Sequence, residues 1–95
     1  RPPILEMDQS GMRLRGLSDK SEKFFLWQEI EMIEYDLYRS HRTSADLDIR
    51  ILYFYPKDQD ASAISLNLDD VKDVSFNELH QQISELAPHI KWLFP

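Results

Sequence analysis

The chain has 95 residues, of which 42% are hydrophobic, 12% aromatic and 29% charged, which is enough for one small domain with a single core. With 17 acidic and 11 basic residues, its formal net charge of −6 argues against nucleic-acid binding, which needs a basic surface. The absence of cysteine excludes disulfides, thiolate metal ligands and cysteine nucleophiles. We therefore expect one domain over residues 1–95.

The N-terminal residues predict a β-hairpin. Ile4–Met7 is a short apolar run, and the polar turn after it ends at Gly11, which can adopt the positive φ of a tight hairpin. Residues 12–17 then alternate apolar and basic, which is typical of a half-buried strand. Arg13 and Arg15 are expected on the exposed face of this strand.

The stretch over residues 24–33 carries the clearest fold signal. It begins with an aromatic strand, is interrupted by a polar pair expected to form a bulge or a single helical turn, and then resumes its alternation. A helix over residues 27–37 is the alternative, because its apolar residues also suit a helical stripe. We favour a strand because residues 35–38 are β-like and no helix stop follows. Trp27 and Ile30 are expected at the corner where the sheet bends.

Two further strands are expected after a polar loop over residues 39–46. Residues 48–55 carry β-branched and aromatic side chains on both faces, which indicates a central strand covered on both sides. Pro56 ends this strand, and a turn follows. Residues 63–68 alternate, with the leucines and Ile64 toward the core.

A single helix is expected near the C-terminus. Ser75 begins an S-x-x-E capping box, and apolar residues recur at helical spacing after it. Pro88 is expected to end the helix near Ala87. Residues 91–95 form an apolar tail.

This order of elements, with two short motifs, resembles the bacterial pleckstrin-homology-like (PH-like) domains. The first motif is the hairpin Leu5-Glu6-Met7-Asp8-Gln9-Ser10-Gly11, and the second is the corner Trp27-Gln28-Glu29-Ile30-Glu31-Met32-Ile33. The resemblance implies a partly open, bent antiparallel β-barrel capped by the C-terminal helix. It also implies seven strands, one more than the six identified above. The seventh is expected within residues 16–22 or 69–74.

The same resemblance bears on location. Several such families carry transmembrane helices just before the domain, often followed by a basic-Pro segment such as Arg1-Pro2-Pro3. The chain also starts without an initiator methionine, so we expect an excised piece of a longer protein. The resemblance implies a cytoplasmic domain of a small membrane protein, with any membrane anchor outside residues 1–95.

The sequence contains no catalytic motif. His41, His80 and His89 lack metal-ligand spacing, no serine lies in G-x-S-x-G, and the two glycines cannot form a phosphate-binding loop. We expect a non-enzymatic domain without metal or cofactor. One alternative is a carboxylate- or metal-dependent accessory domain of an enzyme, using the acidic residues between Glu29 and Asp36. Another is a purely structural domain of a larger protein.

Two groups of residues are candidate binding sites. The basic residues around the first hairpin could bind an anionic lipid headgroup or a phosphopeptide, or form an ordinary exposed strand face: Arg13, Arg15, Lys20 and Lys23. The C-terminal tail could contact a membrane or a protein partner, or fold back on the barrel: Trp92, Leu93 and Phe94. The leading hypothesis is a non-enzymatic interaction or regulatory module at the cytosolic face of a membrane.

Overall fold

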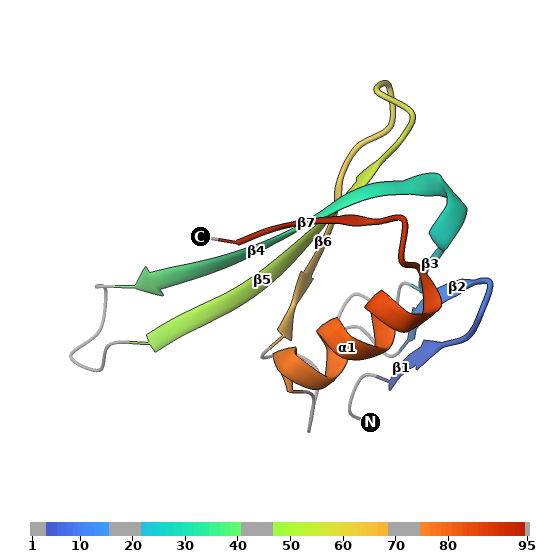
Figure 1. Cartoon of the computed structure of the whole chain (residues 1–95). Helices are drawn as coiled ribbons and strands as arrows, with labels where there is room; N and C mark the ends of the chain where they lie inside the picture. Colours follow the sequence, from blue (N-terminus) through green and yellow to red (C-terminus); the bar gives the residue numbers. More distant parts are fainter. Residues whose placement is uncertain (1–3, 16–21, 41–46, 69–74, 95) are drawn as a thin grey trace.

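The computed structural model describes residues 4–15, 22–40, 47–68 and 75–94 (Figure 1). In chain order the elements are β1 (Ile4–Met7), β2 (Gly11–Arg15), β3 (Lys23–Leu26), the 3-10 helix η1 (Trp27–Glu29), β4 (Ile30–Ser40), β5 (Leu47–Pro56), β6 (Ile64–Asn67), α1 (Phe76–Leu86) and β7 (Lys91–Leu93). The prediction of a mainly β fold with one C-terminal helix is confirmed.

The described strands form two sheets instead of one closed barrel. The first is antiparallel, with order β1-β2-β3, and the second has order β6-β5-β4-β7. Within the second sheet β7 runs parallel to β4, and the other pairs are antiparallel. The seventh strand is therefore the C-terminal tail, which the sequence had not indicated as a strand. Residues 16–21 and 69–74, where that strand was expected, lie outside the described residues.

The first hairpin forms as predicted, but Gly11 has a different role. The Asp8 carboxylate closes the turn by accepting hydrogen bonds from the backbone N–H groups of Ser10, at 2.8 Å, and Gly11, at 3.0 Å. Gly11 does not adopt a positive φ. A Cβ at this position would lie 2.1 Å from the carbonyl oxygen of Phe25 on β3. Glycine is needed here because the two strands approach closely.

The corner between the sheets is built around Trp27. Its side chain is 2% exposed, and its indole N–H donates a 2.8 Å hydrogen bond to the carbonyl oxygen of Asp8. A carboxylate oxygen of Glu29 accepts a 3.2 Å hydrogen bond from the Leu26 backbone N–H, which satisfies a free donor at the start of η1. The helical turn and the strand after it were both predicted. The alternative of a helix over residues 27–37 is wrong.

The second sheet has one buried face and one open face. On β5, Leu52 and Phe54 are fully buried, whereas Tyr53 and Tyr55, which point the opposite way, are half-buried. We call these the inner and outer faces of the sheet. The expectation that this strand is covered on both sides is wrong, because α1 and the first sheet pack against the inner face only (Figure 1).

The helix α1 packs on the core through Leu79 and Ile83, both buried, and ends at Ala87, just before Pro88 as predicted. Ser75 stands at the N-cap, but its side chain makes no capping hydrogen bond, so the predicted capping box is not formed. At the start of the helix, Phe76 stacks on Tyr35 of β4 with ring centroids 4.0 Å apart. No helix among the described residues is long and apolar enough to cross a bilayer.

Candidate interaction surface at the C-terminal strand

Strand β7 is held in place by the buried residue Ile90 just before it and by its own pairing with β4. Ile90, only 6% exposed, anchors the chain in the core, and its backbone N–H donates to the carbonyl oxygen of Ala87 at 3.2 Å. The chain then pairs with β4, and Trp92 lies opposite Ile33. Strand β4 is the only described neighbour of β7 in the sheet, and no other described strand pairs with the opposite edge of β7, which we call its free edge. Free strand edges can pair with another chain.

Aromatic rings support the inner side of β7. The His80 ring on α1 meets the Trp92 ring at a centroid distance of 4.5 Å, and the Trp92 and Phe94 rings are parallel at 6.2 Å. Phe76 contacts both of these rings edge-on, at 6.2 and 6.1 Å. The cluster is packed at its Phe76 end and open at its Phe94 end, because Phe94 is 50% exposed.

Most of the exposed large hydrophobic side chains in the described residues gather on β4 and around β7. Leu37 is 44% exposed, Leu93 is 46% exposed and Phe94 is 50% exposed. The other is Phe24 on β3, whose ring lies 5.3 Å from the Arg13 guanidinium. We define the β7 surface as Leu37, Trp92, Leu93 and Phe94 together with the free edge of β7. Leu93 is in register with Glu34 and lies on the outer face of the sheet, whereas Trp92 is in register with Ile33 on the inner face, so the apolar side chains flank the edge of β7 from both sides. Exposed apolar side chains at such an edge are typical of binding surfaces.

The sequence identified three of these four residues. Trp92, Leu93 and Phe94 were candidates because aromatic residues in an exposed tail are unusual, and the structure places them on a paired strand. The tail does fold back, as one of the alternatives had it. Leu37 was missed, since its place in the apolar alternation of β4 indicated a buried side chain.

The structure does not gather the basic candidate residues into one site. Arg13 and Arg15 share the exposed face of β2, but Arg13 pairs with Glu22 at 3.0 Å and Arg15 pairs with Glu6. Lys23 points elsewhere and donates to the Ser65 carbonyl oxygen on β6 at 3.2 Å. Lys20 lies outside the described residues. Two of these charges are therefore already balanced by neighbouring carboxylates.

The acidic residues from Glu29 to Asp36 do not all converge, although Glu34 and Asp36 share the outer face of β4. Glu29 caps η1, Glu31 is exposed, and Glu34 accepts a 2.6 Å hydrogen bond from the Tyr55 hydroxyl. Among the described residues no three His, Asp or Glu side chains are placed to hold a metal ion. The carboxylates instead belong to local hydrogen bonds or to the open faces of the strands.

The histidines take part in packing or in the backbone network. His80 belongs to the aromatic cluster, and Nε2 of His89 lies 3.0 Å from the Trp27 carbonyl oxygen. That contact joins the turn after α1 to the corner at η1. His41 lies outside the described residues.

A cleft of about 400 Å³ opens between the corner at η1 and the turn that joins β5 to β6. Its walls are largely apolar, with Phe24, Ile30 and Ile64 among them, and Glu29 and Lys57 stand beside them. The carboxylates Glu29 and Asp58 line the cleft, and no described histidine does.

Comparison with known proteins identifies no relative of this chain. No protein-family model matches the chain, and the searches of curated proteins and of solved structures find no significant match. Any assignment of function therefore has to come from the chemistry of the surfaces described above.

Proposed function

We propose that this domain is a non-enzymatic interaction module and that its β7 surface binds an extended segment of a protein partner. The segment would add to the sheet beside β7, with backbone hydrogen bonds along the free edge and its apolar side chains against Leu93 and Phe94. The observation that carries the proposal is the free edge of β7 flanked by exposed Leu37, Leu93 and Phe94.

The other surfaces support binding less well. An anionic lipid headgroup or a phosphopeptide would have to compete with Glu22 and Glu6 for Arg13 and Arg15. An enzymatic role would need a convergent group of carboxylates or histidines, and of the carboxylates from Glu29 to Asp36 only Glu34 and Asp36 share a face. Neither alternative has a surface comparable to the one around β7.

We also propose that the fold is a variant of the PH-like architecture, located at the cytosolic face of a membrane. The architecture is supported by the Asp8–Gly11 turn and by the buried corner of Trp27 and Ile30, which occupy the two motifs of that resemblance. The location is suggested by the same resemblance and by nothing else in the chain.

The test is site-specific photo-crosslinking in cells that make the full-length protein. A photoreactive p-benzoylphenylalanine replaces Leu93 in one variant and the exposed helix residue Gln81 in a matched control. We expect a protein adduct from position 93 and none from position 81. Adding Phe94→Ser to the first variant should remove most of the adduct.

Three results would contradict the proposal. They are equal adducts from both positions, no adduct from position 93, or an adduct at position 93 that consists of lipid. An adduct between two copies of the chain would identify the partner as the protein itself.

A further inference from the structure

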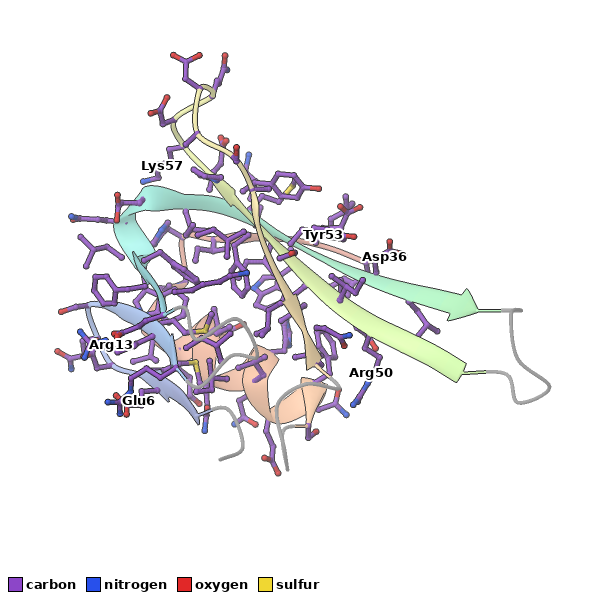
Figure 2. The ribbon with its side chains drawn as sticks, turned by 180° about the vertical axis from the view of Figure 1, so that it is seen from behind. Glu6, Arg13, Asp36, Arg50, Tyr53 and Lys57 are labelled. Atoms are coloured by element: carbon purple, nitrogen blue, oxygen red, sulfur yellow. The ribbon has the colours of Figure 1, made fainter. Side chains whose placement is uncertain are left out.

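The outer face of the second sheet is a second surface, and no described helix or strand covers it. The register of β4 with β5 places six side chains on it in two adjacent rows: Met32, Glu34, Asp36, Ile51, Tyr53 and Tyr55. All six are partly buried by one another, although neither α1 nor the first sheet packs on this side (Figure 2). Tyr53 and Asp36 are labelled there on neighbouring strands.

The composition of this face is that of a contact surface. Tyrosine and methionine are enriched in protein–protein interfaces, and here they lie next to Ile51 and to exposed Leu93 of β7. In an ordinary antiparallel sheet, the face open to solvent carries polar or charged side chains. Strand β6 has such side chains on this face, Ser65 and Asn67. The β5 row, with Ile51, Tyr53 and Tyr55, is more apolar than that, whereas the β4 row combines Met32 with two carboxylates.

The charge of the outer face indicates which kind of partner it would bind. Glu34 and Asp36 are neighbours on one face of β4, and their cross-strand partners on β5 are Tyr53 and Ile51. Neither carboxylate forms an ion pair within the described residues. The basic Lys91 lies opposite Met32, at the other end of the row. The β4 row of the face therefore carries two negative charges, next to the aromatic and apolar side chains of the β5 row.

The Glu34 carboxylate is also held in position. It accepts the 2.6 Å hydrogen bond from the Tyr55 hydroxyl, and one oxygen of the carboxylate is left for another donor. This hydrogen bond, together with partial burial and the charges of Glu34 and Asp36, raises the pKa of Tyr55 above its usual value of 10.0. A tyrosine hydroxyl is protonated at neutral pH with or without this shift, so it donates to the Glu34 carboxylate and orients it.

From this geometry we propose that the outer face binds an arginine-bearing segment of a protein partner. The planar guanidinium group would donate to Glu34 and Asp36 and stack on the ring of Tyr53. Neighbouring apolar side chains of the segment would cover Met32 and Ile51. Arginine fits this surface better than lysine because its flat, weakly hydrated group both pairs with carboxylates and stacks on aromatic rings.

This inference goes beyond the proposed function, because it concerns the outer face of β4 and β5 and a different chemistry; of the β7 surface only Leu93 borders that face. The β7 surface offers backbone hydrogen bonds and exposed aromatic side chains on the inner side. The outer face offers two carboxylates and two tyrosines. One surface can fail a binding test while the other passes it.

The experiment selects binders from a displayed library of random twelve-residue peptides on the full chain and measures their affinity by fluorescence anisotropy. We expect enriched peptides that carry arginine beside apolar residues. Replacing that arginine by lysine should weaken binding, and the double variant Glu34→Gln/Asp36→Asn should weaken it by about tenfold or more. Glutamine at position 34 keeps an oxygen for the Tyr55 hydroxyl, and thermal unfolding verifies that the double variant is folded.

The matched control is Glu78→Gln/Glu85→Gln, which removes the same charge from the exposed side of α1. We expect the control to bind the peptides within about twofold of the parent, because these carboxylates lie outside the outer face. Phe94→Ser should also retain binding, which separates this test from that of the β7 surface. The inference is overturned by a failure to enrich arginine peptides, by unchanged binding to the Glu34/Asp36 variant, or by an equal loss in the α1 control.

Discussion

At the scale of single residues, Trp27 determines the corner where the first sheet meets the second. It is buried, its indole N–H is bonded to the Asp8 carbonyl oxygen, and its ring meets Phe25 edge-on at 5.6 Å. Trp27→Ala should lower the free energy of unfolding by about 3–5 kcal/mol, because it leaves a large cavity in the core. Urea denaturation followed by circular dichroism measures this loss. A variant as stable as the parent would show that Trp27 is not the corner.

The hydrogen bonds of the Asp8 carboxylate predict that the stability of the folded domain depends on pH. The backbone N–H groups of Gly11 and Ser10, with a smaller effect of the Arg13 charge, hold the pKa of its carboxyl group below the usual 3.8. The carboxylate therefore stabilises the folded state above pH 3.8, and this contribution disappears as the pH falls through the lowered pKa.

Asp8→Ala should accordingly be less stable than the parent at pH 7, and the difference should shrink toward pH 3. Urea denaturation at both values tests this, with Gln9→Ala in the same exposed turn as the control. A difference that stays constant between pH 7 and pH 3 would show that the charge of Asp8 is not involved.

At the scale of elements, the pairing of β2 with β3 depends on the missing side chain of Gly11, which lies opposite Leu26. Gly11→Ala would place a methyl group against the backbone of Phe25, so the strands must separate locally. We expect a loss of about 1–3 kcal/mol in the free energy of unfolding. Ser10→Ala at the neighbouring exposed position should cost less than about 0.5 kcal/mol. Equal effects of the two substitutions would contradict this account of Gly11.

The elements that the sequence predicts well are those determined by local pattern. Alternation identified β2 and β6, β-branched and aromatic residues identified β5, the polar pair identified η1, and helical spacing with Pro88 gave the extent of α1. The β7 strand was not predictable in the same way. It has three residues, and its extended shape comes from pairing with β4, far away in the sequence.

The local sequence pattern also could not predict how exposed a side chain of β4 would be. Alternation shows that Leu37 lies on the same face as Ile33, but it does not show how far along the strand the covering elements reach. Ile33 is fully buried and Leu37 is 44% exposed, because β4 and β5 extend past α1 (Figure 1). Three of the four side chains of the candidate site, those of the C-terminal tail, could be identified from the sequence as unusual chemistry, whereas the strand edge and Leu37 required the tertiary structure.

At the scale of the whole molecule, charge separates protein binding from lipid binding. The net charge is −6, and two of the arginines on the first hairpin are paired with glutamates. We expect no more of the domain to sediment with anionic vesicles than with neutral vesicles at low salt, since simple attraction is absent. Preferential sedimentation with anionic vesicles that is lost in Arg13→Gln/Arg15→Gln would restore the basic hairpin as the binding site.

The central claim is that a partner pairs with the free edge of β7. Backbone amide hydrogen exchange tests it most directly, measured by NMR on the domain alone and with the protein captured at position 93 by crosslinking. Strand addition should slow the exchange of amides in residues 91–94 and leave those of β2 unchanged, because new backbone hydrogen bonds form only at that edge. Binding that leaves exchange in residues 91–94 unchanged, or that slows it on β2 instead, would contradict the claim.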